Sequence, residues 1–350
     1  MNRLDSAQAL SILFLVTAMV TAVAFNAAKP RVMILQSYHP DYPWTRDVDA
    51  GIERIARRWT DYSVTWHYMN TKNLSDKESL RYAGIVARRA IDQFDPLVLI
   101  AVDDLAQKLA AKYYVDHPNM SIVFSGVNGS AEPYGYEGAE NVTGIFERKP
   151  WQAVKEMVLT LEREKAQPNP RPTIRYLMDP SPSMQRDRAF IDAFDWSPLH
   201  FGGTYVAENY DRWQQHVQAL HDQQIDYLLL ANYRKLPRSE TDPSFPPPAE
   251  IMGWTEAYSA IPVIGVNVFN VEDGAAIAVG ASPFEQGEVA ATMAETLLEE
   301  GLRGQDLAMR LNRQYVVAIH QDALSKRDLR LPQIYETFAR TTATYIEGGQ

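Results

Sequence analysis

Aromatic and polar residues gather between positions 37 and 44, directly behind a short run of apolar residues. Aromatic rings offer a flat apolar contact to a sugar face or to another ring, while hydroxyl groups fix the polar substituents of a ligand. We therefore take Ser37, Tyr38, Tyr42 and Trp44 as candidate ligand-binding residues. Their side chains indicate recognition of a small organic molecule.

Further candidates follow other apolar runs, and their carboxylate, amide and hydroxyl groups could orient polar parts of the same ligand. They are Asp103, Asp104, Ser125, Asn128, Asp179, Asn232, Tyr233 and Asn267. The alternative is structural: the tyrosines pack, and the Asp and Asn residues cap helices. The turn-forming sequence Asp-Pro-Ser-Pro favours that alternative for Asp179.

Hydrolysis by Asp103 and Asp104 is a third possibility, but consecutive residues at the end of a strand point in different directions. We find no His spacing typical of zinc enzymes, no Gly-x-Gly-x-x-Gly after the first strand and no Gly-x-Ser-x-Gly around Ser125. Cysteine is absent, which removes thiol catalysis and disulfides. The sequence thus predicts a protein that is not an enzyme and has no metal site and no cofactor.

Strands and helices alternate along the chain, and most candidate residues directly follow a predicted strand. The first unit is a strand at 32–35, a loop at 37–44 and a helix that begins behind Thr45. The capping sequence from Ser75 to Glu78 predicts a second helix, and 97–102 is a fully apolar strand. This rhythm predicts an α/β fold with parallel sheets, in which ligands bind at the carboxyl ends of the strands.

A second series of the same kind follows residue 146, with strands predicted at 173–178, 227–231, 261–268 and 275–281. The 350 residues are enough for two domains. A formal charge of −10 and the lack of a basic run argue against nucleic-acid binding. A loop rich in proline lies between 232 and 251, longer than the usual connection of about 2–6 residues.

The N-terminal stretch from Ala9 to Phe25 is almost entirely apolar and ends in small residues. Arg3 precedes it, and Ala22-Val23-Ala24 fits a signal-peptidase site. We expect residues 1–28 to be a signal peptide that directs export. An uncleaved membrane anchor is the alternative.

Four stretches resemble one known family: Gln-Ser-Tyr-His-Pro at 36–40 with Trp44, Asn-Val-Thr-Gly at 141–144, Ile-Pro-Val-Ile-Gly at 261–265, and 274–281 leading to Gly287. Their order resembles the ABC-transporter substrate-binding family, which includes tryptophan- and tyrosine-binding proteins. The resemblance covers nearly the whole chain after the signal peptide. It implies the type I periplasmic binding protein fold, with two Rossmann-like lobes joined by a hinge of several crossings.

The resemblance also implies that the lobes are discontinuous. The N-terminal lobe would hold residues 29–145 and 282–310, and the C-terminal lobe 146–281 and 311–350. A monomer in the periplasm would capture an amino acid, sugar or nucleoside between the lobes and present the closed form to an ABC permease. The alternative partner is a membrane sensor kinase or cyclase.

Overall fold

The structure is a computed structural model that describes residues 6–348, apart from the side chains of Ser6, Ala9, Ala27, Pro182, Ser183 and Arg186. The described chain divides into two compact units. Unit 1 comprises Met1–Phe146 and Pro283–Arg310, and unit 2 comprises Glu147–Ser282 and Leu311–Gln350. The chain therefore passes between the units at three points.

Unit 1 is built on a six-stranded sheet of order β11-β5-β4-β3-β1-β2, in which β1 to β5 are parallel. Its strands are β1 Arg31–Gln36, β2 Ser63–Tyr68, β3 Val98–Val102, β4 Ser121–Val127, β5 Val142–Phe146 and β11 Arg310–Leu311. Its helices are α1 Ser6–Ala28, α2 Pro43–Ala56, α3 Lys77–Phe94, α4 Asp103–Leu109 and α10 Pro283–Glu300, with short 3-10 turns at Ala111–Tyr114, Glu132–Tyr134 and Gly304–Asp306.

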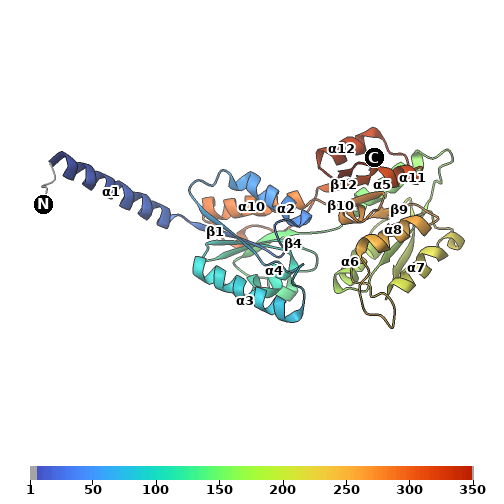
Figure 1. Cartoon of the computed structure of the whole chain (residues 1–350), viewed down its shortest axis with the longest axis horizontal. Helices are drawn as coiled ribbons and strands as arrows, with labels where there is room; N and C mark the ends of the chain where they lie inside the picture. The colour runs from blue at the N-terminus through green and yellow to red at the C-terminus, as the bar shows by residue number, and fades with distance from the viewer. Residues whose placement is uncertain (1–5, 349–350) are drawn as a thin grey trace. The chain divides into compact units, whose positions relative to one another are not determined.

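Helices α2 and α10 lie side by side on one face of this sheet, although more than 200 residues separate them in sequence (Figure 1). Helices α3 and α4 cover the other face (Figure 1). The strand β3 is buried along its whole length, as expected of a strand covered on both faces.

Unit 2 has a seven-stranded sheet of order β13-β12-β10-β9-β8-β6-β7, in which β12 pairs antiparallel with β10 and every other pair, including β12 with β13, is parallel. Its strands are β6 Thr173–Met178, β7 His200–Val206, β8 Tyr227–Leu230, β9 Val263–Gly265, β10 Ile277–Ala281, β12 Tyr315–His320 and β13 Tyr345–Ile346. Its helices are α5 Trp151–Arg163, α6 Pro182–Ala193, α7 Tyr210–Ala219, α8 Pro248–Tyr258, α9 Phe269–Glu272, α11 Gln321–Lys326 and α12 Gln333–Thr341, with a 3-10 turn at His221–Gln223.

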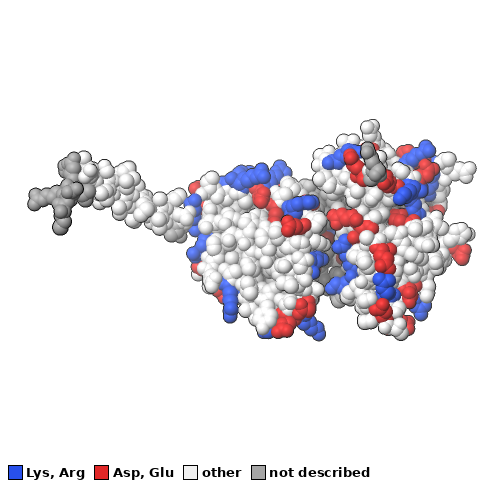
Figure 2. Space-filling model, viewed as in Figure 1, with Lys and Arg blue, Asp and Glu red and all other residues white. Residues whose placement is uncertain are grey.

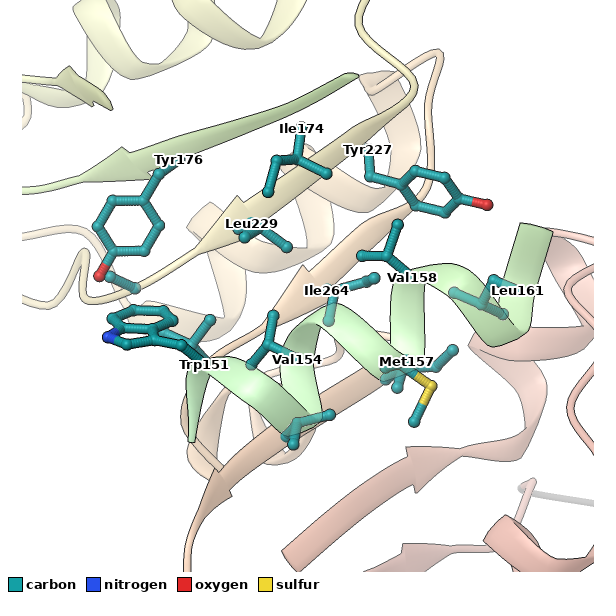
Figure 3. Close-up of a cluster of buried hydrophobic side chains, with 14 of the residues drawn as sticks. Trp151, Val154, Met157, Val158, Leu161, Ile174, Tyr176, Tyr227, Leu229 and Ile264 are labelled. Carbon is teal, nitrogen blue, oxygen red and sulfur yellow. The ribbon is translucent and has the colours of Figure 1, made fainter. Parts of the chain in front are cut away.

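Helix α5 packs its apolar face on the sheet of unit 2. Figure 3 shows Val154, Met157, Val158 and Leu161 on this helix, with Ile264 and other strand residues beside them. These positions recur at intervals of three and four residues, the spacing that places side chains on one face of a helix. The resulting cluster is one of two that fill the core of unit 2.

The prediction of an α/β fold with two mostly parallel sheets is confirmed. Several boundaries were wrong. Helix α2 begins at Pro43, so Trp44 lies in its first turn and not in the preceding loop, because proline is well suited to the first position of a helix. Asp76, and not Ser75, caps α3 by accepting the backbone N–H of Glu78 and Ser79.

The apolar N-terminal stretch forms helix α1, whose large side chains are exposed, with Leu10 and Phe14 as examples. Within the described part of the chain, no helix meets the length and hydropathy required to cross a membrane. Figure 2 shows acidic and basic side chains interspersed on the face in view.

Candidate ligand site at the carboxyl edges of the sheets

The candidate residues of unit 1 follow β1, β3 and β4, whose carboxyl ends meet at one edge of the parallel sheet. Ser37 lies at this edge and is fully buried. Its hydroxyl donates to the carbonyl of Val102 at 2.6 Å and accepts the backbone N–H of Ala106 at 2.8 Å. Ser37 thus joins the ends of β1 and β3 and satisfies one free N–H in the first turn of α4.

Tyr38 and Tyr42 form an aromatic pair with their ring centroids 5.2 Å apart. The ammonium of Lys72, from the loop after β2, lies 4.5 Å from the centroid of Tyr38 and 5.1 Å from that of Tyr42. A cation over an aromatic face contributes about 0.5–2 kcal/mol, depending on desolvation. A positive charge therefore lies beside the two rings. The sequence did not predict this position of Lys72.

Trp44 is half-buried and packs against the apolar cluster that includes Val32 and Val48. Its indole Nε1 is buried without a hydrogen-bond partner among the described residues, and so is Nδ1 of His39. A buried donor without a partner costs about 1–3 kcal/mol. The segment that sequence analysis singled out therefore retains unsatisfied hydrogen-bonding groups that a ligand or a water molecule could pair.

A buried network that sequence analysis missed lies beside this segment. Asp49 accepts a hydrogen bond from Nε2 of Gln36 at 2.5 Å and another from the hydroxyl of Tyr68 at 2.9 Å. Burial raises the pKa of Asp49 to about 6, although both hydrogen bonds oppose the shift. The available signal was an acidic residue between Val48 and Ile52 on the apolar side of a predicted helix.

Asp49 makes the stability of the protein depend on pH in a direction that can be measured. A carboxyl whose pKa is higher in the folded state favours folding when protonated, so stability falls as pH rises from about 4 to about 6. Asp49→Asn removes this titration. We expect the wild type to lose about 1–2 kcal/mol relative to the variant between pH 4 and pH 7.

Urea denaturation of both proteins across this pH range gives their free energies of unfolding. Subtracting one free energy from the other cancels the titration of other groups. Parallel curves for the two proteins would show that Asp49 titrates in the folded state as it does in the unfolded chain.

The two consecutive carboxylates have different surroundings. Asp103 is buried and has a φ of +67°, and its Oδ1 would lie only 2.7 Å from a Cβ at Gly126. Asp104 instead accepts hydrogen bonds from the hydroxyl of Tyr134 and, at 3.5 Å, from Nδ2 of Asn128. The two carboxylates therefore have different neighbours. The fold brings Asp104 and Asn128 together.

Ser125 is fully buried, and its hydroxyl donates to the carbonyl of Gln286 in α10 at 3.1 Å. The side chain of Gln286 accepts the N–H of Gly126 at 2.8 Å and donates to the carbonyl of Phe146 at 3.2 Å. Gln286 therefore connects the ends of β4 and β5. The sequence does not predict this role of Gln286, because Gln286 lies 160 residues from Gly126.

In unit 2, Asp179 is fully buried at the end of β6 and accepts the backbone N–H of Ser181 at 3.0 Å and of Lys235 at 3.3 Å. Asn232, after β8, accepts the N–H of Arg234 at 3.1 Å. These hydrogen bonds are those of turns. For Asp179 they match the structural alternative, a turn and cap.

Tyr233 is fully buried, and its hydroxyl donates to Asp273 at 2.6 Å. The same carboxylate pairs with the guanidinium of Arg234 at 2.9 Å. The side chain of Tyr233 thus joins the end of β8 to the segment after α9.

Asn267 follows β9 and accepts a hydrogen bond from the ammonium of Lys149 at 2.5 Å. Lys149 is almost fully buried and lies 3.4 Å from the carboxylate of Glu147. Burial lowers the pKa of Lys149, but the carboxylates of Glu147 and Asp187 more than offset it, so the pKa is raised and the ammonium stays charged. Neither Glu147 nor Lys149 is among the predicted site residues, although both lie just after β5.

Comparison with known proteins finds similar structures but no match in sequence. No family profile matches this sequence, and no curated protein matches it at a significant level.

Solved structures, in contrast, match over nearly their whole length. A substrate-binding protein with adhesive properties from Clostridium difficile, in its ligand-free open form, has 15% identity and a TM-score of 0.65, covering 92% of this chain and 99% of that one. An ABC domain in complex with L-Trp from Streptococcus pneumonia has 13% identity and a TM-score of 0.57, covering 89% and 98%. An arabinose-binding protein from Geobacillus stearothermophilus has 11% identity and a TM-score of 0.57, covering 89% and 99%.

These neighbours are binding proteins rather than enzymes. At such low identity the likeness establishes the fold alone. The chain has the type I periplasmic binding protein fold, which the resemblance in its sequence had implied.

Proposed function

We propose that this protein is a solute-binding protein that captures a small polar organic molecule with groups at the carboxyl edges of its two sheets. The observation that carries the proposal is the aromatic segment after β1, which holds the Tyr38–Tyr42 ring pair and in which Nδ1 of His39 and Nε1 of Trp44 are buried without a partner in the described chain. In open parallel sheets, ligands bind at this edge. Aromatic surface beside a few polar groups suits an amino acid, a sugar or a nucleoside.

We further propose that the protein is exported to the periplasm by its N-terminal segment and delivers its solute to an ABC permease. The apolar stretch that ends in Ala22-Val23-Ala24 supports export. Solute-binding proteins of ABC transporters are among the structural neighbours, including one from Bradyrhizobium with a TM-score of 0.52, which supports transport. The solute-bound form would be the state that the permease recognises.

A metabolite library screened by melting temperature tests the proposed function. A ligand that binds only the folded protein adds about 2.7 kcal/mol of stability at a hundredfold excess over its Kd. We expect one chemically related group of hits, none of which is consumed during incubation. Turnover of a hit would contradict the proposal.

Trp44→Ala should weaken binding of the best hit by about thirtyfold, since loss of a buried aromatic contact at a binding hot spot costs about 2 kcal/mol. Trp254→Ala is the matched control, because Trp254 is also half-buried but lies on α8, where it packs against a core cluster of unit 2. If Trp44→Ala lowers the melting temperature and leaves affinity unchanged, Trp44 serves only the core of unit 1.

A further inference from the structure

Arg175 in β6 has neither an ion pair nor a hydrogen bond to any other described residue, and its Nε is buried without a partner. The side chain is only partly exposed. Its guanidinium lies 4.4 Å from the ring centroid of Tyr205 in the neighbouring strand β7. A buried N–H of a charged group without a partner is costly, so this position favours an occupant that accepts hydrogen bonds.

The side chain of Arg175 lies on the opposite face of the sheet from α5. Ile174 and Tyr176 lie with the α5 cluster (Figure 3), and successive residues of a strand point to opposite faces. Leu177 belongs accordingly to the cluster on the α7 side. The guanidinium is therefore separated from the core that α5 covers.

A β-bulge makes room for this guanidinium. Ile174 pairs with Phe201 and Tyr176 pairs with Thr204, so Gly202 and Gly203 together lie opposite Arg175. A Cβ at Gly202 would lie 3.4 Å from Cζ and Nη2 of Arg175, and one at Gly203 would lie 3.6 Å from Nη1. Gly203 also has a φ of +95°, which other residues rarely adopt. The two glycines leave the planar group lying against bare backbone.

The surroundings of Arg175 are positively charged. The ring of His216 in α7 stacks on the ring of Tyr205, with centroids 4.5 Å apart. Burial lowers the pKa of His216, and the charges of Arg212 and Arg175 lower it further. Arg212 donates to Gln215 at 2.9 Å and has no ion pair among the described residues. Arg212 and Arg175 thus both act on His216, and neither has an ion pair among the described residues.

We propose that Arg175 forms a binding site for a small tetrahedral oxyanion such as sulfate or phosphate. A guanidinium presents parallel N–H groups that match two oxygens of such an ion, and the bulge opposite Arg175 keeps side chains out of its way. The site lies in the first half of β6, whereas the proposed solute site lies at the carboxyl end of the strands. It is therefore a second site, independent of the proposed function.

Titration of the protein with sodium sulfate, followed by NMR of the His216 imidazole, tests this site. We expect saturable binding that raises the pKa of His216, because the anion offsets the two neighbouring cations. Sodium chloride at equal ionic strength should give a smaller shift that does not saturate. Phosphate should act like sulfate, and acetate, which carries only one negative charge, should bind more weakly.

Arg175→Gln should weaken sulfate binding at least tenfold, and Arg175→Lys, which keeps the charge but loses the fork of N–H groups, should weaken it by a smaller factor. Arg340→Gln is the matched control, since Arg340 also lies over a tyrosine ring but already pairs with Glu336. If Arg175→Gln lowers the melting temperature below the working range, Arg175→Lys carries the comparison. Chloride as effective as sulfate, acetate binding at least as tightly, or unchanged binding in the Arg175 variants would each overturn the proposal.

Discussion

Gly287→Ala should destabilise unit 1 by about 3 kcal/mol or more. A Cβ at Gly287 in α10 would lie 1.9 Å from the carbonyl oxygen of Val48 in α2, and a Cβ at Gly51 in α2 would lie 2.1 Å from the carbonyl oxygen of Phe284. Rigid backbone atoms cannot move aside as a flexible side chain would. The two helices must separate, which also disturbs the apolar cluster beneath them.

Gly253→Ala is the control, because Gly253 lies within α8 and a Cβ there would meet nothing within 4 Å. Alanine is preferred over glycine inside helices, so this variant should be unchanged or more stable by up to about 1 kcal/mol. Chemical denaturation of the two variants measures the contrast. Equal stability would show that α2 and α10 do not pack backbone to backbone.

Arg327→Met should cost about 3–5 kcal/mol. The Arg327 guanidinium bonds Glu256 at 2.7 Å and donates to the backbone carbonyls of Ser259 and Ile261 at 2.9 Å each. The Arg327 and Glu256 side chains are 15% and 12% exposed. Burial raises the pKa of Glu256 even with Arg327 present. Removing the arginine therefore leaves a buried carboxylate without its counter-charge, the arrangement that destabilises most strongly.

Arg238→Met tests whether loss of any arginine has this effect. Arg238 pairs with Glu250 at 2.9 Å, but both side chains are 41% exposed, and exposed pairs contribute about 0–1 kcal/mol. Denaturation midpoints of the two variants give the comparison. A similar small loss in both would mean that the C-terminal segment is held to α8 by packing alone.

Periodicity and strand-end chemistry were enough to predict the fold class. Apolar runs such as 97–102 are unambiguous because a strand buried on both faces has no polar alternation. Short elements were harder to define. The predicted strand 261–268 is only Val263–Gly265, and the two-residue strand β13 was not predicted, because its pairing with β12 depends on tertiary contacts and not on local pattern.

Sequence alone could place the candidate residues at strand ends but could not assign their partners. The hydroxyl of Ser37 donates to the backbone carbonyl of Val102, and that of Ser125 donates to the backbone carbonyl of Gln286 in α10. Such contacts join residues that are distant in sequence. Asp49 and Lys149 were missed for a related reason: a charged residue within or beside a helix looks solvent-exposed until the elements that bury it are known.

Native mass spectrometry of the protein purified from its host tests the central claim most directly. We expect one small organic molecule bound per chain, which is lost on denaturation and recovered chemically unchanged after prolonged incubation with fresh protein. Recovery of a chemically altered molecule, or failure of every host metabolite to bind, would contradict the account.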